Sequence, residues 1–357
     1  MGVSCCNCDK KNKKRVINYN NKNLKNNQKN LKENKIKEFG FKNIGNTCYM
    51  NSFLQILLHI PNFISKLKRY YENFNDNSLI KCLINLYENP SNYKYLNTII
   101  GIMNNKSSEY KYKMQNDSQD FGIDLINEII KDIKGEEDYS SEKDCITNSE
   151  KINEYKKYIS KYQNPNNEIF IEKMFIINES HSISKLNGFS KIKFYCSLNM
   201  ELSFPKTINE KYLNEYSLFD LLDFNYDNNS KINQNEKFIK NRNNLIKICK
   251  LPEILIITIV RAVFKEDLNR TKLNFPKILN LKNYIDSDLL DINKINTKYE
   301  LFAINEKIGN SKSFGHYYCH IYLENNWYLF DDELVKIDEI NLCSKEVVGL
   351  FYKNIDK

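Results

Sequence analysis

Residues 43–61 read NIGNTCYMNSFLQILLHIP and predict a buried helix that begins beside a cysteine. Five apolar residues of this stretch recur at helical spacing and fall on one face: Met50, Phe53, Leu54, Leu57 and Leu58. Asn46 or Thr47 can cap the first turn, and Pro61 should end the helix. Cys48 would lie where free backbone N–H groups and the helix dipole stabilise a thiolate. This position favours a nucleophile, although a lone cysteine is more often an inert apolar residue.

A nucleophilic Cys48 needs a base, and the chain has only four histidines. His59 lies eleven residues along the same predicted helix, about 16 Å away, and cannot reach the thiol. His181 lies in a polar stretch in which we recognise no orienting carboxylate. His316 and His320 share one face of a predicted strand, so only one of them can meet Cys48.

The position of His316 favours it over His320. His316 follows Gly315 at the start of its strand, where a loop can approach closely. A hairpin through residues 324–326 would pair this strand with residues 327–330 and place Asp331 or Asp332 beside His316. Such a carboxylate fixes the tautomer of the imidazole and stabilises the imidazolium. By themselves, the two aspartates are also typical of a turn after a strand.

Helical patterns dominate the chain to about residue 163, and strand patterns dominate the rest. A second helix is predicted from Asp117 or Ser118 to Gly135. The predicted strands span residues 170–177, 191–204, 254–260, 299–307, 316–323, 327–330 and 347–352. Residues 136–167 and 205–250 are charged and weakly periodic, so we expect insertions with loops or exposed helices. Helices followed by strands predict an α+β fold.

The composition indicates a folded protein of a reducing compartment. Hydrophobic residues make up 41% of the 357 residues, which is too many for a disordered chain. The ten cysteines form no regular disulfide framework, and we find neither a secretory signal nor an apolar run of about 18 residues, so we predict a cytoplasmic protein. The net charge is +8, but the lysines are scattered and no nucleic-acid-binding signature accompanies them. We therefore expect no nucleic-acid partner.

Residues 1–35 predict a disordered basic tail, because they carry too few apolar side chains to order. Gly2 is an acylatable glycine, Cys5 and Cys6 are clustered thiols, and residues 10–15 are polybasic. Two such signals together support peripheral membrane attachment, here at the cytoplasmic face. Cys6 replaces the Ser or Thr that is usual at this position for N-myristoylation. The alternative is an unmodified tail whose thiols are incidental or bind metal opportunistically.

Several segments resemble one known family, the ubiquitin-specific proteases, which are papain-like deubiquitinases. Residues 40–55 resemble the cysteine box of the family almost throughout. Residues 115–121 resemble its Gln-Asp box, and residues 251–261 resemble its proline-strand-arginine segment. Its histidine box is resembled by residues 299–304, 315–318, 327–332 and 349–352. The resemblance covers about residues 36–357, which we expect to form one catalytic domain. It implies a papain-like α+β fold with a helical thumb, a mixed palm and β-stranded fingers.

The resemblance also implies catalytic roles. Cys48 would attack the carbonyl of the C-terminal glycine of ubiquitin and form a thioester, while His316 takes and returns the proton. Asp331 would orient His316, and Asp332 matches a family position that can assist. Asn43 matches the amide that donates to the oxyanion beside the backbone N–H of Cys48.

Further positions of the family contact ubiquitin, so the expected partners are ubiquitin and ubiquitinated proteins. Gln115, Asp117 and Asp120 match positions that grip the arginine-bearing tail of ubiquitin, although these residues also suit helix capping. Tyr317 resembles an aromatic residue that walls the channel for the terminal glycines. Residues 309–314 would form a mobile loop over that channel.

The chain departs from the family pattern at its fingers. Many members hold a structural zinc there between two Cys-x-x-Cys pairs, but residues 170–204 contain only Cys196. We therefore expect no metal and no cofactor. Ala262 stands where an aromatic residue commonly follows the arginine, which here is Arg261. Two alternatives stay open: a ubiquitin-binding pseudoenzyme whose site is held closed, and a thiol protease for a ubiquitin-like modifier or another substrate.

Overall fold

The protein is represented by a computed structural model, which describes residues 39–108, 110–111, 113–135, 141–142, 148–162, 168–184, 190–207, 211–226, 244–263 and 267–355. The predicted tail, with Gly2, Cys5 and Cys6, lies outside these residues, and its boundary at residue 35 stays a prediction. Among the described helices, none is both long and apolar enough to cross a membrane.

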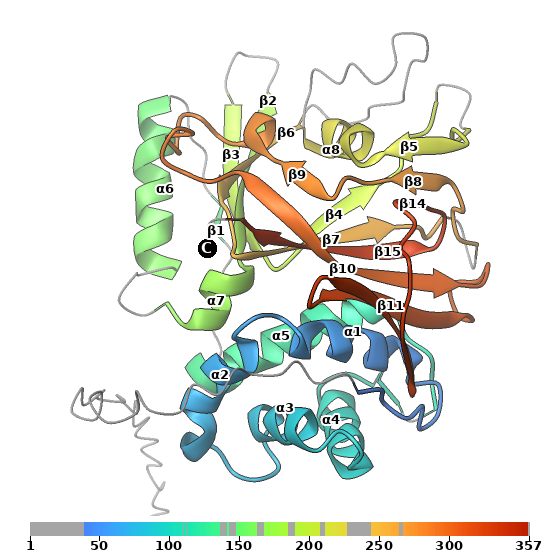
Figure 1. Cartoon of the computed structure of the whole chain (residues 1–357). Coiled ribbons are helices and arrows are strands. Elements are labelled where there is room, and N and C mark those ends of the chain that lie inside the picture. Colours follow the sequence, from blue (N-terminus) through green and yellow to red (C-terminus); the bar gives the residue numbers. More distant parts are fainter. Residues whose placement is uncertain are drawn as a thin grey trace, which may run out of the picture. The chain divides into compact units, whose positions relative to one another are not determined.

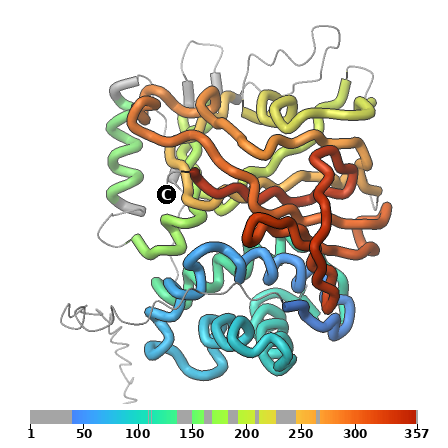
Figure 2. The backbone as a smooth tube through the Cα atoms, in the orientation of Figure 1, coloured from blue at the N-terminus to red at the C-terminus, as the bar shows by residue number. Residues whose placement is uncertain are grey.

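The first part of the fold is helical, as expected. Its α-helices are α1 (Cys48–Leu58), α2 (Phe63–Leu67), α3 (Leu79–Glu88), α4 (Tyr93–Lys106) and α5 (Ser118–Lys134). All residues of α1 are buried, because this helix packs between α5 and a strand from the other end of the chain, β11 (His316–Leu323). Figure 2 shows α1 in blue against the red C-terminal strands. The fold thus brings the N-terminal helix to the C-terminal sheet.

The sheet behind α1 has eight strands. Seven follow the order β13-β12-β11-β10-β15-β7-β4, and β9 pairs with β10. Besides β11 they are β4 (Met200–Ser203), β7 (Ile254–Val260), β9 (Ile278–Asn280), β10 (Lys298–Ile308), β12 (Asn326–Asp331), β13 (Leu334–Ile337) and β15 (Val347–Asn354). The pairing is antiparallel except between β4 and β7. β7 reads ILIITIV and is mostly buried, as a central strand covered on both faces requires.

Two smaller sheets complete the described fold (Figure 1). One has the order β1-β3-β2-β6, with β1 (Ser141–Glu142), β2 (Ile177–Ser184), β3 (Ser190–Ser197) and β6 (Asn244–Lys250). The other has the order β14-β8-β5, with β5 (Glu215–Ser217), β8 (Lys272–Asn274) and β14 (Cys343–Ser344). Three further helices are α6 (Asn148–Tyr162), α7 (Phe170–Phe175) and α8 (Leu218–Tyr226). The α+β class is confirmed.

The prediction of a strand over residues 170–177 is wrong. Residues 170–175 form α7, and β2 begins only at Ile177. The buried side chains Ile171, Met174 and Phe175 have helical i, i+3, i+4 spacing. Glu172 also accepts a hydrogen bond from the backbone N–H of Ile169 at 2.9 Å, which closes the first turn. A short apolar run fits both structures, and here the helical spacing decides.

Two other predictions need correction. The single strand predicted over residues 191–204 is two strands, β3 and β4, joined by a turn in which Ser197 donates to the carbonyl of Asn199. Residues 205–250, predicted as loops or exposed helices, contain the buried helix α8, whose Leu218, Leu221 and Leu222 are 0% exposed. Its start carries a reciprocal Ser217–Asp220 cap, which is a recognisable sequence signal.

Candidate active site

The loop before α1 is held in shape by one asparagine side chain. Asn43 accepts hydrogen bonds through Oδ1 from the N–H groups of Gly45 and Thr47, both at 3.1 Å. Thr47 is the N-cap residue of α1, but its hydroxyl accepts from Ile44 at 3.1 Å instead of capping the helix. Cys48 follows as the first helical residue and is 4% exposed. The thiol therefore lies at the positive end of the helix dipole.

The structure brings Cys48 and His316 into contact. A hydrogen bond with the Cys48 thiol is the largest cause that raises the pKa of His316 to about 9, and Asp331 raises it further, whereas partial burial opposes both. Asp331 Oδ1 lies 2.5 Å from Nε2 of His316. Because Nε2 faces the carboxylate, Nδ1 is the ring nitrogen left for the thiol. The three side chains form the arrangement of a nucleophile, a base and an orienting carboxylate.

The hairpin between β11 and β12 explains how Asp331 reaches His316. Leu323 pairs with Asn326, so the turn consists of Glu324 and Asn325, both with positive φ angles of 45° and 70°. Such two-residue turns match the twist of the strands that they join. The register that pairs Cys319 with Phe330 places Asp331 on the same face as His316, as a diagonal neighbour.

Asp332 points elsewhere and ties the hairpin to the cysteine loop. Its φ is +51°, and its Oδ2 accepts from Asn43 Nδ2 at 3.0 Å. Its Oδ1 accepts from Asn51 Nδ2 at 2.8 Å, and its backbone oxygen accepts from the N–H of Phe41 at 2.8 Å. One amide N–H of Asn43 is thus used by Asp332, which leaves the second for an oxyanion. Asn51 was not selected from the sequence, although a polar residue inside an apolar helix is a recognisable signal.

A buried polar cluster joins α1 to its neighbours and was also missed. Ser118 donates to the carbonyl of Tyr49 at 2.7 Å, and its Oγ lies 3.1 Å from that of Ser52. Asn305 Nδ2 donates to the same Ser118 oxygen at 2.7 Å. The cluster connects α1, α5 and β10, which is the neighbour of the histidine strand. It fixes the helix of the nucleophile relative to the strand of the base.

The residues expected to hold the ubiquitin tail also hold the site itself. Gln115 donates to the carbonyl of Gly315 and accepts from its N–H at 3.2 Å, so it clamps the backbone before His316. Gly315 has a φ of +155°, and a Cβ there would lie 2.5 Å from the Ile308 carbonyl oxygen, so only glycine fits. Asp117 caps α5 and accepts from the hydroxyl of Tyr317 at 3.1 Å.

Asp120 belongs to an acidic group next to Asp117. Partial burial, followed by the carboxylates of Asp117, Glu201 and Asp124, raises the pKa of Asp120 to about 6. Lys312, from the loop before His316, acts in the opposite direction. Unfavourable negative charge therefore accumulates at the position where the resemblance places a cationic peptide. Glu201 was not selected from the sequence, because only the fold brings β4 to the start of α5.

The other histidines do not contact Cys48. His59 is the C-cap residue of α1, and its Nδ1 lies 2.7 Å from the Gln55 carbonyl oxygen. His320 pairs with Glu306 at 2.9 Å. His181 has a carboxylate beside it, contrary to the prediction: Glu179 lies 2.9 Å from its Nε2. Residues two apart on a strand share a face, so the sequence held that carboxylate.

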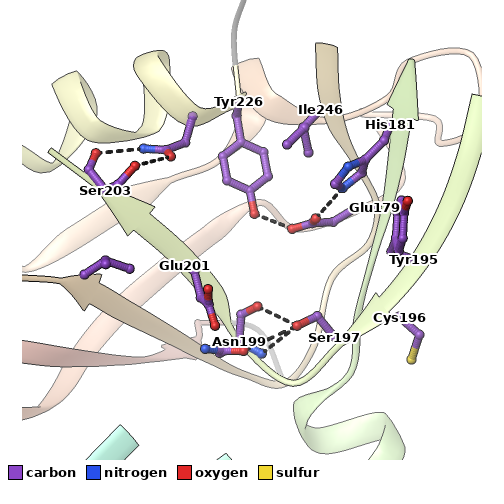
Figure 3. A pocket seen from close by; sticks show the side chains of 12 residues that line it. Glu179, His181, Tyr195, Cys196, Ser197, Asn199, Glu201, Ser203, Tyr226 and Ile246 are labelled. Carbon is purple, nitrogen blue, oxygen red and sulfur yellow. Dashed lines mark hydrogen bonds and ion pairs between the residues drawn. The ribbon is translucent and has the colours of Figure 1, made fainter. Parts of the chain in front are cut away.

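Figure 3 shows His181 and Glu179 in a cavity of about 510 Å³ that opens among β2, β3, β4 and α8. Tyr226 donates a hydrogen bond to Glu179, which lies between Tyr226 and His181. Asn199, on the other side of the cavity, donates to Thr258 at 2.8 Å. These polar groups satisfy one another. The cavity differs in this respect from the site at Cys48, where a thiol meets a base.

Three residues of the candidate site lie close enough together to hold a metal ion. Ligand atoms of His316, Asp331 and Asp332 lie within 4.8 Å of one another, and among the described residues they are the only such group. The two carboxylates already bind His316, Asn43 and Asn51, so the arrangement has an account without an ion. The absence of a metal and of a cofactor stays a prediction.

Comparisons with known proteins agree with this geometry. The family model described as ubiquitin carboxyl-terminal hydrolase matches residues 39–352. Ubiquitin carboxyl-terminal hydrolase 4 of Arabidopsis thaliana is 26% identical over 329 residues, which are 84% of this chain and 85% of that protein. Ubiquitin carboxyl-terminal hydrolase 12 of Salmo salar is 26% identical over 343 residues, which are 89% of this chain and 90% of that protein.

Solved structures share the fold. The SAGA Ubp8/Sgf11/Sus1/Sgf73 DUB module bound to ubiquitin aldehyde contains a chain with a TM-score of 0.60 and 21% identity, over 88% of this chain and 69% of that one. A second structure of the SAGA Ubp8/Sgf11/Sus1/Sgf73 DUB module contains a chain with a TM-score of 0.58 and 22% identity, over 88% of this chain and 67% of that one. At 21–22% identity the structural similarity establishes only the shared fold, whereas the match to the family model over residues 39–352 establishes family membership. The chain belongs to the ubiquitin carboxyl-terminal hydrolase family.

Proposed function

We propose that the protein is a thiol-dependent deubiquitinase that cuts the isopeptide or peptide bond after the C-terminal glycine of ubiquitin. The observation that carries this proposal is the contact of Cys48 with His316, which is itself paired with Asp331. Membership of the family supports ubiquitin as the acyl group. The complete set of catalytic groups argues against a pseudoenzyme.

The first half of the reaction forms a thioester. His316 holds the proton of the Cys48 thiol as an imidazolium at neutral pH, because contact with Cys48, and then with Asp331, raises its pKa to about 9. The sulfur attacks the glycine carbonyl carbon, and the carbonyl oxygen becomes an oxyanion. The second N–H of Asn43 and the backbone N–H of Cys48 would donate to this oxyanion. The C–N bond then breaks, and the departing amine takes the proton from His316.

The second half releases ubiquitin. A water molecule gives a proton to His316 and attacks the thioester carbonyl carbon. The same two donors stabilise the new oxyanion, and the C–S bond breaks as the carboxylate of ubiquitin forms. Asp331 stabilises the imidazolium in both halves, and Asp332 positions Asn43 without touching the substrate.

Cleavage of ubiquitin that carries a C-terminal fluorophore tests the proposal. The wild type should release the fluorophore, and Cys48→Ala should abolish release. Cys343→Ser, at a partly buried thiol away from His316, is the matched control and should retain wild-type activity. Equal rates for wild type and Cys48→Ala would refute the mechanism. Parallel fluorophore conjugates of ubiquitin-like modifiers would reveal whether another modifier is the true acyl group.

We further propose that residues 1–35 attach the protein peripherally to the cytoplasmic face of a membrane. Gly2, the thiols of Cys5 and Cys6, and the polybasic stretch at residues 10–15 support this proposal. A Gly2→Ala variant should shift from the membrane fraction to the cytosolic fraction of cells while its cleavage of the fluorophore substrate stays unchanged. Identical fractionation of the two proteins would refute the attachment.

A further inference from the structure

We propose that an acidic pocket beside Asp331 is a subsite for a lysine or arginine side chain of the polypeptide that leaves when the isopeptide bond is cut. This inference rests on the proposed function and adds to it a preference among ubiquitinated proteins. The pocket has a volume of about 360 Å³ and opens on β10, β11 and β12. Asp331 forms part of its wall, so it begins one side chain away from His316.

The lining of the pocket is strongly acidic. Five of its residues are carboxylates: Glu306, Asp331, Asp338, Glu339 and Glu346. None of its lining residues, all of which the structure describes, is a lysine or an arginine. Cations outside the lining offset part of this charge: Lys336 lies 3.7 Å from Asp338, and Arg261 and Arg270 attract Glu346. These three cations are fewer than the five carboxylates, so negative charge remains for a cationic guest.

His320 has one ring nitrogen without a hydrogen-bond partner, although other donors of the pocket, Tyr318 and Ser344, bind its carboxylates. His320 is 8% exposed, and its Nδ1 lies 2.9 Å from Glu306 Oε2. Because a carboxylate only accepts, Nδ1 carries the proton, and in the neutral imidazole Nε2 is an acceptor. Nε2 has no hydrogen-bond partner, and Asp338 Oδ2, at 3.7 Å, is an acceptor too. In the neutral form of His320 this buried nitrogen is an acceptor without a donor, and a cationic N–H group would satisfy it.

The spacing of the acidic groups favours an organic cation over a metal ion. In the described part of the chain, only His316, Asp331 and Asp332 bring ligand atoms close enough together to hold a metal. The carboxylates of the pocket are more widely spread, as a guanidinium or ammonium group with several N–H donors requires. The ring of Tyr318 also lines the pocket and provides a surface that suits a cation.

The pocket lies on the side of β11 that faces away from the residues expected to hold ubiquitin. Tyr317, which contacts Asp117, alternates along the strand with His316, Tyr318 and His320, so its side chain lies on the opposite face. The acyl part of the substrate approaches from the side of Asp117. The pocket is therefore placed for the leaving polypeptide, near residues that flank its acceptor lysine.

The test uses ubiquitin joined to the lysine side chain of short peptides in which arginine, glutamine or glutamate flanks that lysine on both sides. For the wild type, kcat/KM should be roughly fivefold higher with arginine than with glutamine, and the difference should shrink at high salt. In Asp338→Asn/Glu339→Gln the difference should fall to within about twofold. Charge reversal in Asp338→Lys/Glu339→Lys should favour the glutamate peptide.

Two controls separate this inference from the proposed function. The fluorophore substrate carries no peptide on the leaving side, so all variants should cleave it at the wild-type rate, which also shows that they fold. Asp76→Asn/Glu88→Gln makes the same change of charge at residues of the helical part and should retain the arginine preference. Equal rates for the three peptides in the wild type, or a preference that survives in Asp338→Asn/Glu339→Gln, would overturn the subsite. Failure to cleave the fluorophore substrate would instead remove the proposed function, and this inference with it.

Discussion

Two histidine–carboxylate pairs lie on the same face of β11, and only one of them meets a thiol. His316 lies 2.5 Å from Asp331 and contacts Cys48, and its side chain is 39% exposed. His320 lies 2.9 Å from Glu306, and both side chains are 10% exposed. The pairs are chemically alike, so the pairing alone does not make a catalytic base. Access to solvent and the neighbouring nucleophile distinguish the site.

Replacement of each histidine in turn should give the largest difference in kcat between the two pairs. His316→Ala should lower kcat for the fluorophore substrate by roughly 10²- to 10⁴-fold, because the thiol loses its base. His320→Gln should change kcat less than about threefold and should instead lower stability by about 1 kcal/mol, because the bond to Glu306 is partly lost. Steady-state kinetics and urea unfolding measure the two effects. A comparable loss of kcat in both variants would show that the pairs are not separate in function.

The oxyanion donor gives the next largest effect. Asn43→Ala should lower kcat by about 10²- to 10³-fold, which corresponds to about 2.7–4 kcal/mol of lost transition-state stabilisation. Asp332→Asn should have a smaller effect of the same kind, since Asn43 remains but loses its partner at 3.0 Å. The effect should appear in kcat with KM almost unchanged. A change confined to KM would place both residues in substrate binding.

The acidic group at α5 predicts a smaller, pH-dependent effect on KM. Asp120 has a pKa of about 6, so it loses its negative charge as the pH falls through that value. KM for ubiquitin should then rise by about fivefold below pH 6, because Asp120 loses the charge that we expect to attract the arginines of the ubiquitin tail. Asp120→Asn should have the higher KM at neutral pH and lack this dependence. Asp132→Asn, in the last turn of α5, is the control and should behave as the wild type.

The smallest expected effect is a change in the pKa of His316, which tests directly whether the thiol distinguishes this pair from the pair of His320 and Glu306. The pKa of His316 is raised from the ordinary value of 6.5 to about 9, so the stability that protonation contributes is fully present below 6.5 and is lost as the pH rises through 9. Cys48→Ala removes the largest cause, so the pKa of His316 should fall. NMR titration of the imidazole in both proteins measures this shift. An unchanged pKa in Cys48→Ala would show that the thiol does not contact His316.

Regular, strongly apolar elements could be predicted from the sequence. The bounds predicted for β7 and β11 agree with the structure, because their runs of β-branched and aromatic residues fit only a strand. Residues 170–175 failed because a short apolar run does not distinguish a buried helix from a strand. The buried α8 was missed because Asn-rich flanking sequence concealed its leucines.

The residues that form the site could be predicted from the sequence, but the contacts that each of them makes could not. The hairpin placed an aspartate beside His316, yet nothing in the sequence shows that the positive φ of Asp332 turns its carboxylate toward Asn43 and Asn51. The clamp of Gln115 on Gly315 was missed for a similar reason. Gln115 contacts backbone atoms of Gly315, and the residue types alone do not indicate which backbone atoms a side chain will bind.

The adjacency of Asp331 and Asp332 couples two functions mechanically. One residue orients the proton carrier, and the next anchors the loop that holds the oxyanion donor. A movement at this point of the chain would displace both side chains, so the support of His316 and the anchor of the Asn43 loop would be disturbed together. A regulator that moves the Asp332–Glu333 turn, which joins β12 to β13, would therefore act on both parts of the catalytic site.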